Sequence, residues 1–97
     1  MNQKQQALGM IETKGVAGLV AAADAAAKTA DVRVTLYEKA DAGLVTIYVL
    51  GEVAAVKASV DAGGEAARQV GQLLSTHVIP RPDVSLWNML EKLMPPE

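Results

Sequence analysis

The apolar residues of this chain repeat alternately every two and every 3.6 residues, and the order of these repeats restricts the fold more than any other feature. A repeat of two is typical of a half-buried strand, and a repeat of 3.6 is typical of an amphipathic helix. The predicted elements are a strand at 7–12, a helix at 16–30, strands at 32–37 and 44–50, a helix at 51–70, a strand at 73–79 and a helix at 83–94. The first six form two consecutive βαβ units, so the sequence predicts an α+β, ferredoxin-like βαββαβ domain with a C-terminal helix.

The length of the chain, 97 residues, fits one compact domain. We expect a polar N-terminal extension at 1–6, the domain at 7–82 and an amphipathic tail at 83–97. The polar start leads into no apolar signal-peptide core, and charged residues interrupt the Ala-rich stretch, so we expect neither a signal peptide nor a membrane span. A domain of this size buries only part of its surface, which makes oligomerisation a natural source of further stability.

Both long helices carry small residues at informative positions. In the first helix, one predicted face consists of Val16, Leu19, Val20, Ala23 and Ala27, and Asp24 and Lys28 form an i,i+4 pair on another face. The second helix contains Gly63 and Gly64, each of which costs about 1 kcal/mol relative to Ala in a helix interior. We therefore expect another backbone to approach these glycines closely, within the subunit or across an interface.

Composition and motifs exclude most chemical functions. The net charge is −2 and the nine basic residues are scattered, which argues against nucleic-acid binding. The chain has no Cys and one His, His77, with only Ser75 and Thr76 near it in sequence, so neither a metal site nor a catalytic triad is predicted. No phosphate-binding glycine motif occurs, and we expect no catalytic residues and no cofactor.

Several segments, in this order and spacing, resemble the hexamer-forming shell proteins of bacterial microcompartments, the BMC domain family. They are 7–15 (ALGMIETKG), 24–28 (DAAAK), 43–46 (GLVT), 56–58 (VKA) with 61–63 (DAG), and 77–82 (HVIPRP). The resemblance extends over about 7–82, and its overall pattern is closer to catabolic compartments, or metabolosomes, than to carboxysomes.

The resemblance implies a structural protein and not an enzyme. It implies a cyclic homohexamer that tiles into facets of a shell in the bacterial cytoplasm, with a central pore for metabolites. The implied partners are further copies of this chain, other shell proteins and, through the tail, encapsulated enzymes; no nucleic acid and no membrane are implied. A small-molecule-sensing regulatory domain of ferredoxin-like topology is the alternative, and such a sensor more often forms dimers or trimers.

Two groups of site residues are implied by their match to the family. The pore-lining group is the loop Lys39, Ala40, Asp41, Ala42 and Gly43. The edge between neighbouring hexamers is assigned Lys28, Arg81 and Asp31, the last at a position where many members have Asn. Asp41 has two interpretations: it forms a polar ring that favours neutral or cationic metabolites, or it is a turn residue and Ala42 alone forms the constriction.

The sequence departs from the family at two further places. Leu50 replaces an arginine that commonly precedes the turn into the second helix. The tail carries an apolar series of Trp87, Met89, Leu90, Leu93 and Met94, with Val84, Trp87, Leu90 and Met94 on one stripe. This tail either docks on its own subunit or contacts cargo or another shell subunit.

Overall fold

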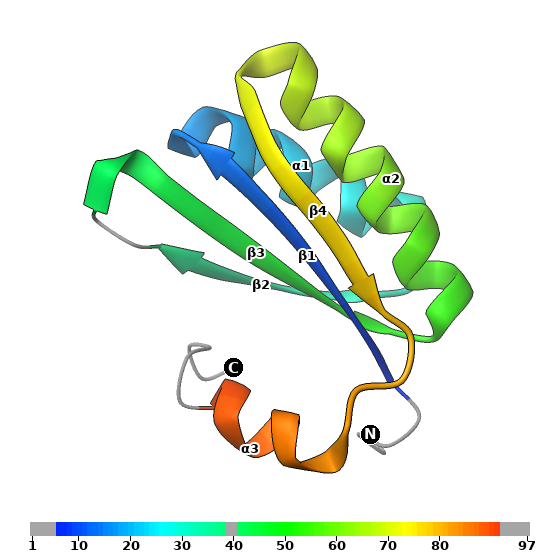
Figure 1. Ribbon diagram of the computed structural model, residues 1–97. Coiled ribbons are helices and arrows are strands. Elements are labelled where there is room, and N and C mark those ends of the chain that lie inside the picture. Colours follow the sequence, from blue (N-terminus) through cyan, green and yellow to red (C-terminus); the bar gives the residue numbers. More distant parts are fainter. Residues whose placement is uncertain (1–5, 39–40, 92–97) are drawn as a thin grey trace.

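The computed structural model describes residues 6–38 and 41–91, and within them the predicted order of elements is confirmed (Figure 1). The elements are β1 (Ala7–Lys14), α1 (Val16–Thr29), β2 (Arg33–Glu38), a 3₁₀ turn (Asp41–Gly43), β3 (Leu44–Gly51), α2 (Val53–Val70), β4 (Gln72–Ile79) and α3 (Val84–Glu91). β1 continues two residues beyond its predicted end because buried Thr13 still pairs with both neighbouring strands. Gly15, at φ 94°, then turns the chain into α1 through a conformation that favours glycine.

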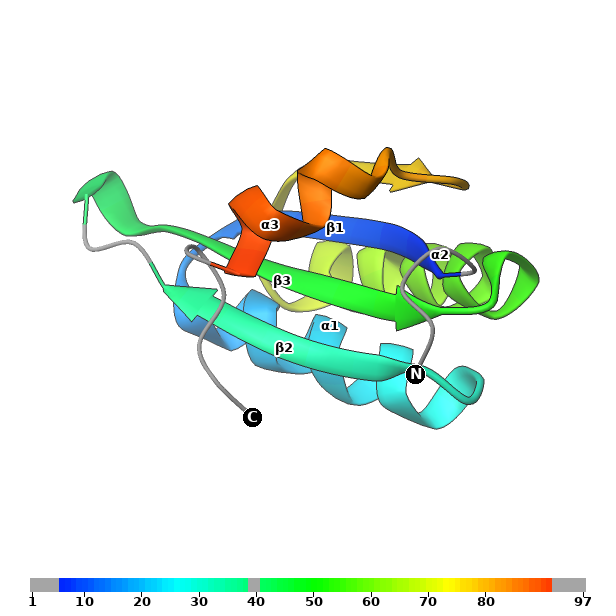
Figure 2. The same ribbon diagram turned by 90° about the horizontal axis from the view of Figure 1, so that it is seen from below.

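The four strands form one antiparallel sheet in the order β2-β3-β1-β4. β3 lies between β1 and β2, the two strands that α1 connects, and β1 lies between β3 and β4, the two strands that α2 connects. This is the split βαβ arrangement, so the ferredoxin-like prediction is confirmed. The helices α1 and α2 cover one face of the sheet, and α3 lies on the opposite face (Figures 1 and 2).

The main core lies between the sheet and the pair α1 and α2. It consists of small and branched side chains: Ala7, Ile11, Leu19, Ala22, Ala26, Val45, Ile47, Val49, Val56, Val60 and Ala67. A Cβ on Gly9 of β1 would lie 2.5 Å from Cγ2 of Val60, so α2 sits directly on the strand backbone. Glu52 begins α2 by accepting hydrogen bonds from the backbone N–H groups of Ala54 and Ala55, at 3.1 and 3.4 Å, which fixes the start of the helix.

Gly63 is the point of closest approach between α1 and α2. A Cβ at this position would lie 2.9 Å from the carbonyl oxygen of Ala22 in α1 and 2.6 Å from Cδ1 of Ile11. The predicted backbone contact is therefore confirmed at Gly63, and it lies within the subunit. At Gly64 the prediction is wrong, because the atoms nearest to its Cβ position belong to the side chains of Thr76 and Leu73.

The predicted apolar face of α1 is not the face that the structure buries. Leu19 is buried as expected, but its buried companions are Gly18, Ala22 and Ala26. The reason is the contact at Gly63: only small residues let the two helix backbones come so close, so α1 is rotated to put Gly18 and Ala22 inward. Val16 and Val20 consequently lie 52% and 54% exposed, and with exposed Ala27 they form a second apolar row, the outer stripe of α1. Ala23, on the same side, is half-buried against the core.

A second apolar cluster lies beneath α3 on the other face of the sheet. Its buried members are Leu8, Tyr48, Leu50, Trp87 and Leu90. The predicted stripe of α3 is right for Trp87 and Leu90 and wrong for Val84, which is 54% exposed. Half-buried Leu86 takes the place of Val84 because the helix turns its 86, 87 and 90 side toward the sheet. Met94 lies outside the described residues, and no helix among those described is long and apolar enough to cross a membrane.

The contact at Gly63 gives a stability prediction with a neighbouring control. Gly63→Ala gains helix propensity but forces a methyl group against the Ala22 carbonyl oxygen, which cannot move without α1. Gly64→Ala gains the same propensity and meets only side-chain atoms of the edge strand β4, the methyl group of Thr76 at 3.2 Å and Cδ2 of Leu73 at 3.6 Å. We expect Gly63→Ala to be less stable than Gly64→Ala by about 1–3 kcal/mol. Denaturant unfolding at equal protomer concentration measures this, and equal stabilities would contradict the close helix contact.

Candidate functional site

The turn between β2 and β3 carries the predicted pore-loop residues. Lys39 and Ala40 lie outside the described residues, as does the side chain of Asp41. Ala42 and Gly43 adopt φ values of 57° and 74°, so two successive left-handed residues reverse the chain into β3. Such a conformation costs an alanine about 1–2 kcal/mol, so the rest of the fold must hold the turn in place.

A main-chain hydrogen bond provides that support. The N–H of Gly15 donates to the carbonyl oxygen of Gly43 at 2.8 Å, which joins the turn to the connection between β1 and α1. The hydroxyl of Thr13 donates to the carbonyl oxygen of Gly15 at 3.1 Å and steadies the same connection. Lys14 is paired in register with Leu44, the first residue after the turn.

Two of the predicted edge residues, Asp31 and Arg81, follow elements that end at the other end of the sheet. Asp31 lies beside the last residue of β3, because a Cβ on Gly51 would be 3.3 Å from the Asp31 carbonyl oxygen. Arg81 follows Ile79, which pairs with Leu8 and so lies at the same end as Leu50. β3 has eight residues, so roughly 23 Å separates this end from the turn at Ala42 and Gly43. The structure therefore separates the two predicted groups.

The charged groups at that far end are exposed and positioned by their neighbours. Nζ of Lys28 lies 3.0 Å from Oδ2 of Asp24, one helical turn earlier, which holds the ammonium group along the surface of α1. Arg81 stands between Pro80 and buried Pro82, and the two proline rings restrict the backbone on both sides of it.

The two departures from the family pattern lie in one apolar cluster. Leu50, 2% exposed, lies in the same cluster as Trp87, which is 4% exposed. An arginine at position 50 would bring a charge into this apolar cluster, so Leu50 suits the docked tail. The two positions are far apart in the sequence. The only indication in the sequence that they are related was that each departs from the family pattern. Nε1 of Trp87 is buried without a hydrogen-bond partner among the described residues.

Asp83 holds the start of α3. Its Oδ2 accepts hydrogen bonds from the hydroxyl group and, at 3.0 Å, the backbone N–H of Ser85. These bonds, the hydroxyl bond first, lower the pKa of Asp83 below its ordinary value of 3.8. A lowered pKa means that the charged cap stabilises α3 above the ordinary pKa and that this stabilisation is lost as pH falls through the folded pKa.

The remaining polar side chains form no catalytic arrangement among the described residues. His77 is exposed on β4 opposite Met10, on the sheet face that also carries Ser75 and Glu12. The hydroxyl of Ser75 donates to Oε1 of Glu12 at 3.4 Å. No three His, Cys, Asp or Glu side chains of the described part gather to hold a metal ion. The candidate functional features are therefore surfaces for assembly. They are the turn between β2 and β3, the end of the sheet near Asp31 and Arg81, the outer stripe of α1 and the docked helix α3.

Comparison with known proteins places these surfaces in context. Residues 7–82 match the model of the BMC domain. The bacterial microcompartment shell protein PduA of Citrobacter freundii is 52% identical over 89 residues, which are 92% of this chain and 96% of that protein. The carboxysome shell protein CcmK2 of Synechocystis is 51% identical over 82 residues, which are 82% of this chain and 80% of that protein.

A solved structure supports the fold. The crystal structure of a microcompartment protein from Desulfitobacterium hafniense superposes with a TM-score of 0.79 at 26% identity and covers 96% of this chain. The present chain spans about half of that solved chain, 51% of its length.

The contact between Leu50 and Trp87 can be tested by fluorescence, because Trp87 is the chain's one tryptophan. Leu50→Arg buries a charge beneath the indole, and displacement of α3 is the way to restore its hydration. We expect a red-shifted emission maximum and stronger quenching by acrylamide. Leu44→Arg, on the same face of the same strand but at the turn end, is the matched control and should leave the emission unchanged. An unshifted spectrum for Leu50→Arg would contradict the docked helix.

Proposed function

This chain belongs to the BMC domain family, and on that premise we propose that it is a structural shell protein of a bacterial microcompartment, a hexameric tile with a central pore. The observation that carries the proposal is the match over 7–82, together with 52% identity to a shell protein over nearly the whole length of both chains. It is a structural protein and not an enzyme. The comparisons give no support to the alternative of a metabolite-sensing regulatory domain.

The compartment is of the metabolosome type, in the bacterial cytoplasm. The PduA match includes 89 residues against 82 for the carboxysome protein, and it covers a larger share of both chains. The chain assembles with further copies of itself and with other shell proteins. We propose the division into an extension at 1–6, a shell domain at 7–82 and a tail at 83–97.

The exposed apolar residues supply two different surfaces for a ring. The outer stripe of α1 lies on the helix that packs toward β2, whereas exposed Val70 and Leu74 lie on α2 and β4, at the opposite edge of the sheet. A cyclic ring joins two unlike surfaces of neighbouring subunits head to tail. Contact between the outer stripe of one subunit and the α2 and β4 side of the next closes such a ring and covers both surfaces.

The turn at 39–43 and the end of the sheet near Asp31 and Arg81 lie far apart, so one can form the centre of the ring and the other its rim. With the turn Lys39, Ala40, Asp41, Ala42 and Gly43 at the centre, the opposite end of the sheet lies outward. That end carries Asp31 and Arg81, which with Lys28 we assign to the edge between hexamers. Two versions of the pore remain: a polar Asp41 ring, or a constriction formed by exposed Ala42 with Asp41 as a turn residue.

The tail has an inner and an outer side. Trp87 and Leu90 dock on the subunit's own sheet, which supports the first of the two interpretations of the tail. Val84 and Met89 remain 54% exposed on the outer side of α3. We propose this outer side as the contact for encapsulated enzymes, because two exposed apolar residues on a short helix suit an amphipathic partner helix.

The proposed ring interface predicts that one substitution disrupts the hexamer and leaves the fold of the subunit unchanged. Val20→Asp puts a charge in the outer stripe and should weaken each subunit contact by about 2 kcal/mol or more, because an interface would bury it without a partner. Native mass spectrometry should show six-subunit rings for the unaltered chain and smaller species for Val20→Asp, with unchanged circular dichroism. Val84→Asp, at an equally exposed position on α3 and away from both ring surfaces, serves as the control. A monomeric unaltered chain at micromolar concentration would overturn the tile proposal itself.

The assignment of residues to the edge between hexamers predicts that substitutions there disrupt sheets and leave the hexamer intact. Lys28→Ala or Arg81→Ala should impair sheets and spare hexamers, since each removes a charged hydrogen bond worth about 1.5–3 kcal/mol from contacts between hexamers only. Electron microscopy scores the sheets and gel filtration scores the hexamers, with Lys57→Ala of α2 as the control. Normal sheets in both variants, or loss of the hexamer, would show that the edge assignment is wrong.

A further inference from the structure

We propose that Lys14 forms a second ring of charge around the pore, at the mouth on the face that carries α3, and that this ring attracts small anionic metabolites such as carboxylates and phosphate esters. The inference rests on the proposed function, because it requires the turn at 39–43 to line the central opening. It adds a residue outside the loop to the groups that set the selectivity of the pore.

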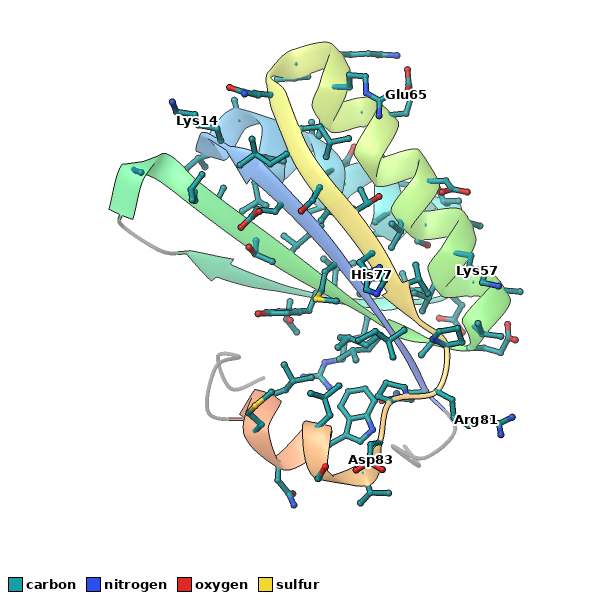
Figure 3. The ribbon with its side chains drawn as sticks, viewed as in Figure 1. Lys14, Lys57, Glu65, His77, Arg81 and Asp83 are labelled. Carbon is teal, nitrogen blue, oxygen red and sulfur yellow. The ribbon has the colours of Figure 1, made fainter. Side chains whose placement is uncertain are left out.

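Two backbone links place Lys14 beside the loop. Lys14 is paired with Leu44, the residue that directly follows the turn, and with Gln72 on the other side. The next residue, Gly15, makes the 2.8 Å hydrogen bond to the carbonyl oxygen of Gly43. Figure 3 shows the Lys14 side chain at the end of β1, near the turn that leads into β3. Any ring that places Gly43 at the centre therefore brings Lys14 with it.

The side chains of β1 alternate between the two faces of the sheet, and this alternation shows at which mouth of the pore Lys14 lies. Leu8 belongs to the cluster beneath Trp87, so the even-numbered residues of β1 face the α3 side of the sheet. The pairing of β1 with β3 is continuous from Leu8 to Lys14, so the alternation carries through to the lysine. The register shift between β1 and β4 after Glu12 adds its extra residue in β4 and leaves this alternation intact. Lys14 is exposed, so its ammonium group is open to solvent on that face.

Lys14 offsets the negative formal charge of the neighbouring loop segment. Glu38, Lys39 and Asp41 give the loop segment a formal charge of −1, and Lys14 cancels it. The nearest charged residue of β1 on the same face, Glu12, lies two residues further from the loop and accepts the hydrogen bond of Ser75. Six-fold repetition then places six ammonium groups around one mouth. Compared with a neutral residue at position 14, six charges at about 10 Å from the axis, with water-like screening and a Debye length of about 8 Å, raise the local concentration of a monovalent anion about threefold.

The test measures ion preference in intact hexamers. Hexamers are incorporated into planar bilayers, and the reversal potential across a potassium chloride gradient gives the chloride-to-potassium permeability ratio. We expect Lys14→Gln to lower this ratio about threefold and Lys14→Glu to lower it about tenfold, with both effects shrinking at about 1 M salt. Lys57→Gln is the matched control: an exposed lysine in the first turns of α2, at the far end of the sheet, whose loss should leave the ratio unchanged.

A loop variant separates failure of this inference from failure of the pore proposal. Asp41→Trp should block both ions if the turn lines the opening. If Asp41→Trp blocks the current but Lys14→Gln keeps the unaltered ratio, the Lys14 ring is wrong and the pore stands. If Asp41→Trp conducts like the unaltered chain, the current does not pass the turn, and both the pore assignment and the Lys14 ring are overturned.

Discussion

The contact between α1 and α2 at Gly63 is the constraint on which the other surfaces depend. Because the Ala22 carbonyl oxygen lies only 2.9 Å from where a Cβ of residue 63 would be, α1 must present Gly18, Ala22 and Ala26 to the interior. Of the larger apolar residues of α1, only Leu19 then finds a place inside, and Val16 and Val20 lie on the surface. A packing requirement within one subunit thus creates the apolar stripe that a neighbouring subunit can cover.

Most of the fold could be predicted from the sequence because the period of the apolar residues is a local property. The order of elements and the close approach at Gly63 followed from periods and glycines alone. The buried face of α1 did not, because Leu19 borders both apolar rows and a helical period cannot tell which row meets α2. The prediction that Val84 shares the docking stripe of α3 was wrong for a similar reason. Val84 has the right spacing from Trp87, but the sheet meets the side of α3 that carries Leu86.

The assembly sites were less accessible to sequence reasoning. The pore loop and edge residues came from resemblance, and only the pairing of the strands shows that they occupy opposite ends of the sheet. Leu50 and Trp87 each appeared as an isolated departure, whereas in space they form one contact whose members explain each other. Pairings across the sheet of this kind depend on tertiary structure, so neither residue alone could indicate its partner.

The hydrogen bond from Gly15 to Gly43 joins two backbone groups, so no side chain of the loop takes part in it. The anchor of the turn is therefore independent of which residues stand at positions 39–41. The loop can be rewritten for a solute of different size or charge while its attachment to the scaffold stays the same. Under the proposed pore assignment, the residues that select the solute are separate from the backbone bond that holds the turn, which makes the turn a natural place for engineering a shell with altered permeability.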